Sequence, residues 1–258
     1  MDRLTDKAHW DGTYTTRKRQ QPLQLTGVGS YCNRLILAKL LETGLEGKRI
    51  LEIGAGDSVW LPYLAKTFPS SQCVGLDYSE SGCALLSERA RTEGANVEVM
   101  HGDMFAESSP LHRTFDVVLS FGVVEHFSDL GRVLSAKSRY AKPDGTVLTL
   151  IPNMAGLLGT LTRRWNPKIY ARHNPHDLRS FSLAHQRAGL NVISSGYLGS
   201  NNFGVLSGCF PERQGIAWNI QRTLFAISLA VWSLEGVAGT FPSTKVFAPY
   251  LYAVSRLL

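Results

Sequence analysis

The 258-residue sequence is poor in cysteine, and its cysteines form no recognisable pattern. Cys32, Cys73, Cys83 and Cys209 make no CxxC pair and lie in no Cys/His cluster. This spacing excludes the disulfide framework of small secreted domains and suggests no structural zinc site. We therefore expect a protein of a reducing, cytoplasmic compartment.

Long apolar runs are also missing. The first residues, MDRLTDKAHWDGTY, are polar from the start and lack the apolar stretch of a secretory signal. The uncharged stretch Thr223–Leu234 is closed by Arg222 and Glu235 after twelve residues, whereas a membrane-spanning helix needs roughly 20. We interpret it as a buried or cap helix, with a dimer contact or a membrane-facing surface as alternatives.

Acidic residues are fewer than basic ones, and the formal net charge is +6. Basic residues gather at positions 17–19 and in the segment Arg163–His173. Either an anionic partner or a solvated basic face would produce this pattern. Because no recognisable RNA-binding module accompanies the basic runs, we expect no nucleic-acid partner. A small, anionic substrate fits the charge.

Short apolar runs alternate with helical patterns through the middle of the chain. Strands are predicted to begin at Arg49, Gln72, Asn96, Phe115 and Gly145. This alternation is typical of a parallel sheet with helices on both faces, and the apolar character of the runs predicts strands buried on both sides. Helices are predicted over Val28–Gly44, from a cap at Asp57 or Ser58 to Phe68, over Ser79–Gly94, over Ser128–Tyr140 and near Asp177–Ala188.

The C-terminal part closes the sheet differently. Two further strands, NVISSGYLG and PYLYAVSRL, are separated by an excursion from about Gly199 to Ala248. We predict a single α/β domain with a Rossmann-like, seven-stranded, mostly parallel sheet, an antiparallel last strand and a helical cap in the excursion. Within it, residues 1–46 form an N-terminal arm and helix, 47–153 a cofactor-binding core and 154–258 the substrate side.

The first predicted strand runs into the turn Gly54-Ala55-Gly56, which suits a ligand. Glycines let the backbone approach a ligand closely, and the following helix directs its free amides toward it. A dinucleotide, a nucleotide phosphate, S-adenosylmethionine or no ligand at all fits the turn alone. Asp77 ends the second strand 21 residues after Gly56, close to the roughly 20 expected for an acid that binds a ribose diol.

Two features argue against other nucleotides. Val59 occupies the position where a dinucleotide fold places its third glycine. No Gly-Lys-Ser/Thr follows the turn, which excludes a phosphate-binding P-loop. A further acid, Asp103 in HGDMF, follows the third strand, where it could accept from an adenine amine or simply cap a helix.

In order and spacing, LEIGAGDS, GLDYSE, HGDMF, FDVVLSFGVVEHFSD and KPDGTVLTLIPN resemble the class I S-adenosylmethionine-dependent methyltransferases. The likeness is greatest to the ubiquinone and menaquinone biosynthesis type, and Ser58 replaces a glycine that many relatives have. The resemblance implies S-adenosyl-L-methionine as cofactor. It assigns the methionine part to Gly54 and Gly56, the ribose to Asp77, the adenine to Tyr78, Asp103 and Met104, and the sulfonium end to Phe121 and the carbonyls around Ser120. The full expected cofactor set is Glu52, Gly54, Ala55, Gly56, Asp77, Tyr78, Asp103, Met104, Ser120, Phe121 and Arg34.

Methyl transfer needs a positioned nucleophile, and a hydroxyl nucleophile also needs a base. His126 follows the fourth strand and is our candidate base, with Glu125 and His173 as further catalytic candidates. Related quinone O-methyltransferases hold a divalent metal with ExxEH. Because Gly122 replaces the first acid here, we expect no metal. Substrate contacts are expected from Tyr14, Asn153, Arg164, Arg172 and His176.

We therefore expect an S-adenosylmethionine-dependent methyltransferase for a small molecule, acting at oxygen, as a monomer or homodimer. The N-terminal arm and the excursion would form its cap. The alternatives are N- or C-methylation of a small molecule, a membrane-associated enzyme for a lipid or quinone precursor, an RNA methyltransferase and a non-catalytic cofactor-binding protein. The Asn/Asp-Pro-Pro-aromatic run common in base-amine methylation is missing after the fourth strand. No transmembrane segment is expected, and peripheral membrane contact stays open as an alternative.

Overall fold

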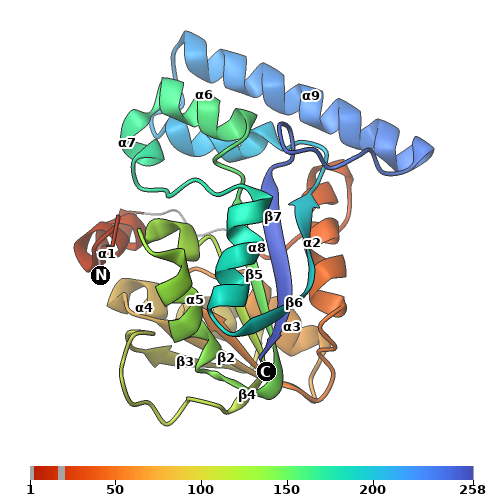
Figure 1. The fold of residues 1–258 in the computed structure, drawn as a ribbon. Coiled ribbons are helices and arrows are strands. Elements are labelled where there is room, and N and C mark those ends of the chain that lie inside the picture. The colour runs from red at the N-terminus through yellow and green to blue at the C-terminus, as the bar shows by residue number, and fades with distance from the viewer. Residues whose placement is uncertain (1–2, 17–20, 258) are drawn as a thin grey trace.

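A computed structural model describes residues 3–16 and 21–257 of the chain. Its centre is one seven-stranded sheet in the order β3-β2-β1-β4-β5-β7-β6 (Figure 1). The first five strands in that order pair in parallel, and β7 is antiparallel to both of its neighbours. The predicted fold class, including the antiparallel last strand, is confirmed. The basic cluster predicted at positions 17–19 lies outside the described residues.

The strands span β1 (Arg49–Ile53), β2 (Gln72–Asp77), β3 (Val97–His101), β4 (Phe115–Phe121), β5 (Ala141–Pro152), β6 (Leu190–Leu198) and β7 (Tyr250–Leu257). β1, β2 and β4 are almost wholly buried, as their apolar sequences predict. β3 differs, since its residues are half-buried or exposed. The expectation of burial on both faces is wrong for β3 because it forms an edge of the sheet.

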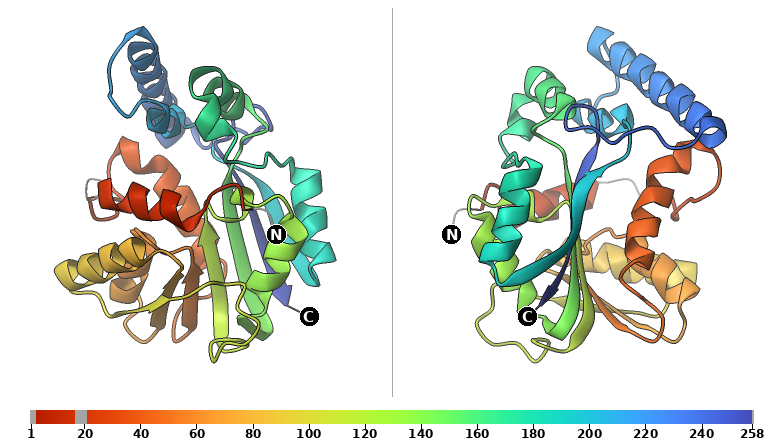
Figure 2. Two further views of the ribbon diagram at one scale, coloured as in Figure 1. Left: turned by 90° about the vertical axis from the view of Figure 1, so that its left-hand side faces the viewer. Right: turned by 45° about the vertical axis from the view of Figure 1, so that its right-hand side comes forward.

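Helices cover both faces of the sheet, as the second panel of Figure 2 shows. One face packs against α2 (Tyr31–Leu41), α3 (Trp60–Thr67) and α4 (Glu80–Glu93) in a core that includes Leu40, Leu64 and Leu86. The other packs against α5 (Leu130–Ser138) and α8 (Leu178–Arg187) in a core that includes Val133 and Phe181. Alternate residues of each strand enter opposite cores, as the two-residue period of a strand requires.

Local signals placed most helix ends correctly. The Ser79 hydroxyl accepts from the Gly82 amide at the start of α4, and the helix ends at Gly94 with φ +64°. Val59, not Asp57 or Ser58, occupies the N-cap position of α3, but the Ser58 hydroxyl accepts from the amides of Trp60 and Leu61. Ser58 thus caps the helix as predicted, although it lies one residue before the N-cap position.

Three boundaries differ from the sequence prediction. A 3-10 turn, η1 (Val28–Ser30), precedes α2, so the predicted helix begins later and ends at Leu41. The turn Lys142–Gly145 lies within β5, where the pairing with β4 is irregular and Asp144 has φ +61°. A further short turn, η2 (Val124–His126), follows β4.

The elements beyond the carboxyl ends of the parallel strands form a cap, visible above the sheet in Figure 2. It consists of α6 (Leu157–Trp165), α7 (Pro167–Tyr170), η3 (Phe203–Cys209) and α9 (Ile216–Ala238). A small core of Leu158, Phe203 and Leu206 joins α6 to η3. The N-terminal α1 (Lys7–Thr16) lies separately, against α4.

The apolar stretch Thr223–Leu234 has twelve residues but lies within a much longer helix. Arg222 and Glu235 continue α9 to 23 residues instead of ending it. The expectation of a buried helix is wrong, because only Gln221, Ser228, Trp232 and Glu235 of α9 are buried. Its place in the cap agrees with the prediction.

Candidate functional site

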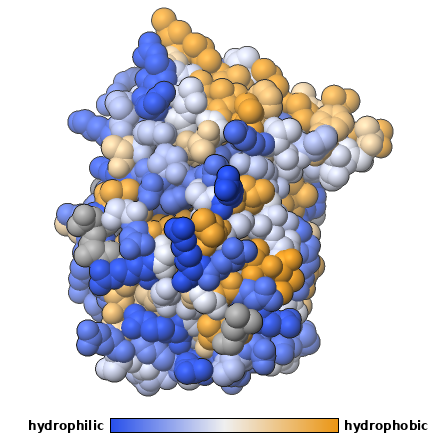
Figure 3. Space-filling model, viewed as in Figure 1, coloured by the Kyte–Doolittle hydropathy of each residue, from blue (hydrophilic) through white to orange (hydrophobic). Residues whose placement is uncertain are grey.

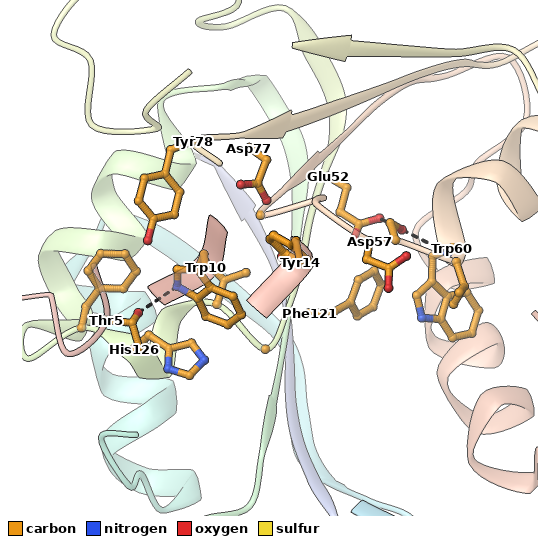
Figure 4. A pocket seen from close by; sticks show the side chains of 16 residues that line it. Thr5, Trp10, Tyr14, Glu52, Asp57, Trp60, Asp77, Tyr78, Phe121 and His126 are labelled. Carbon is orange, nitrogen blue, oxygen red and sulfur yellow. Dashed lines mark hydrogen bonds between the residues drawn. The ribbon is translucent and has the colours of Figure 1, made fainter. Parts of the chain in front are cut away.

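A cavity of about 320 Å³ lies at the carboxyl ends of β1, β2 and β4. This is the point where the strand order reverses, with β2 on one side of β1 and β4 on the other, and ligands of open α/β sheets bind there. In Figure 4, Trp10 and Tyr14 of α1 lie between His126 on one side and Phe121 and Trp60 on the other. The site is thus formed by the sheet edge below and by the N-terminal helix above.

The glycines of the first turn fit tightly into this site. Gly54 has φ +72°, and its amide donates to the Leu76 carbonyl of β2 at 2.8 Å. A Cβ on Gly56 would lie 2.4 Å from the Tyr14 ring, so only glycine admits that ring. Ala55 is fully buried in the core beneath the turn. Gly54 therefore presents bare backbone to the cavity, whereas Gly56 lies under the Tyr14 ring and is not among the lining residues. The cofactor contacts of both glycines stay predictions.

Asp77 is held rigidly at the cavity wall. Its carboxylate accepts from the amides of Gly56 and Ser79, each at 2.8 Å, through different oxygens. Burial raises the pKa of Asp77, and the two amide hydrogen bonds oppose that rise. Since each carboxylate oxygen can accept a second hydrogen bond, a ribose diol facing the cavity has two fixed acceptors available.

Glu52 forms a second acidic group in the cavity wall. Its carboxyl accepts from the Ser58 hydroxyl at 2.7 Å. Burial raises the pKa of Glu52 to about 8, with the nearby Asp77 adding to the rise. A protonated Glu52 can donate as well as accept, which suits a zwitterionic amino-acid group.

A smaller cavity of about 50 Å³ continues past Asp77 toward β3. It shares Gly54, Asp77 and Tyr78 with the larger cavity and extends to Asp103 and Met104. The Asp103 carboxylate accepts from the Phe105 amide and pairs with Arg3. Burial raises the pKa of Tyr78 to about 12, so its ring is a neutral stacking surface.

The chemistry of the two cavity walls suits S-adenosylmethionine. From β1 to β3 the wall offers, in order, bare glycine backbone with Glu52, the carboxylate of Asp77, and Asp103 beside Tyr78. These groups match an amino-acid part, a sugar diol and a purine edge in the same order. The roles of these residues nevertheless remain predictions.

The part of the cavity wall expected to face the sulfonium is aromatic. Phe121 lines the cavity and stacks on Trp60, with ring centres 5.7 Å apart. The Ser120 side chain is buried and accepts from the Lys137 ammonium nitrogen at 2.7 Å instead of lining the cavity. Lys137 also donates to the Leu148 carbonyl and the Thr149 hydroxyl, which fixes the strand ends below the cavity.

The three catalytic candidates lie together although β5 and α6 separate them along the chain. His126 lines the cavity, and its ring centre is 4.7 Å from that of His173. Glu125 is buried behind them, and its Oε2 has no hydrogen-bond partner among the described residues. Burial lowers the pKa of His126 to about 4 and raises that of Glu125 to about 8.

Backbone carbonyls orient both imidazoles. Nδ1 of His126 lies 2.7 Å from the Arg172 carbonyl, and Nδ1 of His173 lies 2.8 Å from the Ile169 carbonyl. Because a carbonyl only accepts, each neutral ring carries its hydrogen on Nδ1. Each Nε2 therefore offers a lone pair.

One ligand atom from each of Glu125, His126 and His173 lies within 4.8 Å of the others. Two imidazole nitrogens and a carboxylate form a donor set that divalent metals use. In space, His173 thus stands in for the third metal-binding group, which the sequence motif lacks because position 122 is a glycine. Either a divalent ion or a hydrogen-bonding substrate group fits among these atoms.

Several predicted residues lie away from the cavity. Arg34 is exposed and donates to the carbonyls of Leu25 and Gly27. Asn153 is buried and donates to the carbonyls of Lys245 and Ala248, which joins β5 to the returning chain. Arg164 is exposed, and neither Arg172 nor His176 lines a described cavity. Arg172 contributes through its carbonyl to His126, as given above. Of the predicted substrate residues, Tyr14 alone lines it among those described.

Other cavity residues escaped the sequence analysis. Thr5, Asp57, Trp60 and Phe127 line the cavity, as does Trp10, whose indole nitrogen donates to the Thr5 hydroxyl at 2.9 Å. Asp57 is fixed by a buried ion pair with Arg89 of α4 at 2.7 Å. Asp57 could have been recognised as a cavity residue because it directly follows the glycine turn. No local sequence pattern marks Thr5 or Phe127 as cavity residues. No residue of the Gly199–Ala248 excursion is among the lining residues of this cavity, so only the arm covers it.

Comparison with known proteins agrees with this geometry. The profile of a family described as a methyltransferase domain matches residues 26–195. A ubiquinone biosynthesis O-methyltransferase of Methylococcus capsulatus is 31% identical over 144 residues, 54% of this chain and 59% of that protein. Its counterpart in Pseudomonas fluorescens is 29% identical over 127 residues, 49% of each protein. The matched segments thus span about half the length of these relatives.

Solved structures share the fold. A geranyl diphosphate C-methyltransferase of Streptomyces coelicolor, solved with Mg²⁺, geranyl diphosphate and S-adenosyl-L-homocysteine, has a TM-score of 0.62 at 14% identity, covering 98% of each chain. A SAM-dependent methyltransferase of Aquifex aeolicus has a TM-score of 0.54 at 17% identity, covering 86% of this chain and 89% of that one. At these identities the likeness concerns the fold alone. The family profile, the curated relatives and the five ordered motifs agree, and the chain belongs to the methyltransferase domain family, with S-adenosylmethionine as its cofactor.

Proposed function

We propose that this protein transfers a methyl group from S-adenosylmethionine to a hydroxyl oxygen of a small aromatic molecule. The observation that carries the proposal is the position of His126, which lines the same cavity as Asp77 and Glu52 and whose ring hydrogen is held on Nδ1 by the Arg172 carbonyl. The O-methyltransferase names of the curated relatives support oxygen as the acceptor atom.

The cofactor would supply an electrophilic methyl group on its sulfonium. Gly54, Gly56, Asp77 and Glu52 would hold it against the sheet edge, with Asp103 and Tyr78 at the purine. Trp10 and Tyr14 would close over it and exclude water, because α1 lies across the cavity (Figure 4).

His126 would accept the proton of the attacking hydroxyl. Its low pKa keeps the ring neutral at physiological pH, so the Nε2 lone pair is available before the acceptor arrives. Bound S-adenosylmethionine would supply the methyl group, and Nε2 of His126 would take up the proton that the acceptor hydroxyl loses. The Arg172 carbonyl, bonded to Nδ1, stabilises the imidazolium that forms.

The class of acceptor follows from the cavity wall. Trp10, Tyr14, Trp60, Phe121 and Phe127 all line it. Such a wall suits a planar ring, which stacks or packs edge-on against aromatic side chains. No cationic side chain lines the larger cavity among the residues that the structure describes, so the predicted anionic character of the substrate has no support there.

A methyl-transfer screen over phenolic and catecholic metabolites, with mass detection of the product, tests the proposal. We expect O-methylated products and release of S-adenosylhomocysteine. Products methylated at nitrogen or carbon would leave the family assignment intact but contradict the choice of acceptor atom.

His126→Asn is the sharpest variant. The Asn amide can still donate to the Arg172 carbonyl as Nδ1 does, yet it has no lone pair in the place of Nε2. We expect kcat to fall about 100-fold or more with cofactor affinity unchanged. His112→Ala, which alters a half-buried histidine remote from the cavity, is the control and should retain full activity.

A further inference from the structure

The cap helix α9 packs against the protein through Trp232, which stacks on Tyr31, and through three buried polar residues. Gln221 donates to the Phe203 carbonyl, and the Ser228 hydroxyl accepts from the Phe203 amide, each at 3.0 Å. The buried Glu235 carboxylate accepts from the Tyr31 hydroxyl at 2.8 Å and from the Ser200 hydroxyl at 2.7 Å. These bonds fix which face of α9 is turned inward.

The outward face of α9 is consequently apolar. Ile216 is 81% and Val237 91% exposed, and Ile220, Ile227 and Leu234 are between 48% and 58% exposed. The spacing of residues 216, 220, 227 and 234 puts their side chains in one stripe along the helix. Figure 3 shows this apolar surface over α9 at the top of the molecule. We call these five residues the α9 stripe.

Charge is almost absent from the helix that carries the stripe. Of the 23 residues of α9 only Arg222 and Glu235 are charged, and Glu235 is buried. A continuous apolar surface of this kind marks a site of contact with another apolar phase or partner. Within residues 3–16 and 21–257 no helix is long and apolar enough to cross a membrane, so a contact in the plane of the surface is the geometry available.

The segments that form the cap carry most of the chain's positive charge. Residues 154–176 and 199–249, which include all the cap helices, contain seven basic residues and two acidic ones, a formal charge of +5 out of the chain's +6. Arg163, Arg164, Lys168 and Arg213 are exposed on these segments, while of the two acids only Glu212 is exposed.

The positive charge of the cap distinguishes between two partners for the stripe, a second copy of the chain and an anionic membrane. A second copy of the chain would bring two strongly positive caps together, and like charges repel. An anionic bilayer attracts the basic residues while its acyl region receives the apolar side chains. We propose that the α9 stripe docks this protein on the surface of an anionic lipid membrane.

Docking in this orientation brings the cavity end of the sheet toward the bilayer. The cap lies beyond the carboxyl ends of the parallel strands, the edge at which the cavity also lies (Figures 1 and 2). An acceptor with an apolar tail can then reach the protein from the lipid phase. The docking surface itself does not depend on which acceptor is methylated.

Co-sedimentation with vesicles of phosphatidylcholine containing phosphatidylglycerol tests the proposal with the full chain. We expect the wild type to sediment with these vesicles, and Ile227→Glu/Leu234→Glu to bind them about tenfold more weakly or less. Arg163→Gln/Arg164→Gln should weaken binding to the anionic vesicles and reduce its salt dependence. Ile193→Glu is the matched control, because Ile193 is 57% exposed on β6, outside the cap.

S-adenosylhomocysteine titration of each variant, read by calorimetry, shows that the fold is intact and separates this test from that of the proposed function. Wild type that stays in the supernatant would overturn the proposal. So would weakened binding in the arginine variant alone, which would indicate a purely electrostatic surface. A dimer in sedimentation velocity that Ile227→Glu/Leu234→Glu dissociates would assign the stripe to a second copy instead.

Discussion

The Arg3 guanidinium pairs with the Asp103 carboxylate and lies over the Tyr78 ring, 4.8 Å from its centre. Both partners line the smaller cavity, the expected place of the adenine. The other Asp103 oxygen already accepts from the Phe105 amide. Arg3 therefore occupies the acceptor and the stacking surface predicted for the purine, and we expect the N-terminal arm to compete with the cofactor for them.

Arg3→Ala should consequently bind S-adenosylmethionine more tightly. The Arg3–Asp103 pair is partly exposed, and such pairs contribute up to about 1 kcal/mol, which corresponds to roughly a fivefold lower Kd. Calorimetric titration measures the change. Lys7→Ala breaks a second arm contact, the exposed pair with Glu80, and should leave the Kd unchanged. Weaker binding by Arg3→Ala would show that Arg3 holds the cofactor instead of competing with it.

Gly56→Ala should lower cofactor affinity by displacing the arm. The new Cβ would lie within 2.7 Å of three Tyr14 ring and hydroxyl atoms, so the aromatic side chain has to move out of the cavity roof. We expect Gly56→Ala and Tyr14→Ala to be strongly non-additive in Kd, since both act on one contact. Gly208→Ala is the control, because nothing lies within 4 Å of its Cβ position and its φ is not positive. Additive effects of the two substitutions in a double-mutant cycle would contradict this coupling.

Lys137→Met should destabilise the fold by about 2–4 kcal/mol. The fully buried ammonium group donates to the Ser120 hydroxyl, the Leu148 carbonyl and the Thr149 hydroxyl. Methionine fills a similar volume but leaves these acceptors without their donor. Urea unfolding gives the free energy directly. Lys66→Met, on the exposed side of α3, should change it by less than about 0.5 kcal/mol.

Stability should fall as the pH rises through neutrality because of Glu52. Its folded-state pKa is about 8, above the ordinary value of 4.5, so the folded state binds the proton more tightly than the unfolded chain. The contribution is fully present below pH 4.5 and is lost as the pH approaches 8. Glu52→Gln keeps an oxygen for the Ser58 hydroxyl and removes this titration.

The unfolding free energy of the wild type should therefore decrease by on the order of 2 kcal/mol between pH 5 and pH 7 through Glu52. Urea unfolding at a series of pH values should show this decrease as a difference between the wild type and Glu52→Gln. Glu125, with a raised pKa, and His126 and His185, with lowered pKa values, titrate in both proteins and cancel in that difference. Identical profiles for the two proteins would show that Glu52 does not titrate in this range.

Methyl transfer should persist after chelation if His126 acts as the base. Dialysis against EDTA would leave turnover unchanged, and added Co²⁺ would give no absorption band of a tetrahedral His-coordinated site. Loss of turnover with recovery on adding a divalent ion, together with a Co²⁺ spectrum abolished by His173→Ala, would instead assign Glu125, His126 and His173 as metal ligands.

The cofactor side of the site could be predicted because its signals are local. Gly54 follows β1, Asp77 ends β2 and Asp103 comes shortly after β3, and parallel strands bring their carboxyl ends to one edge of the sheet. The acceptor side could not be predicted in this way. Arg34 and Tyr14 both belong to the N-terminal part, yet only the packing of α1 against α4 determines that Tyr14 reaches the cavity and Arg34 does not.

By itself, then, the sequence determined the order of the strands, the glycine turn after β1 and the acid that ends β2. Short-range periodicity, caps and glycine positions encode these features within a few residues. Only the tertiary structure decided that His173 lies beside His126 and that α9 turns its polar side inward. Both depend on contacts between distant segments, such as the Glu235 carboxylate with Tyr31, and no local pattern in α9 specifies which of its faces such a partner will cover.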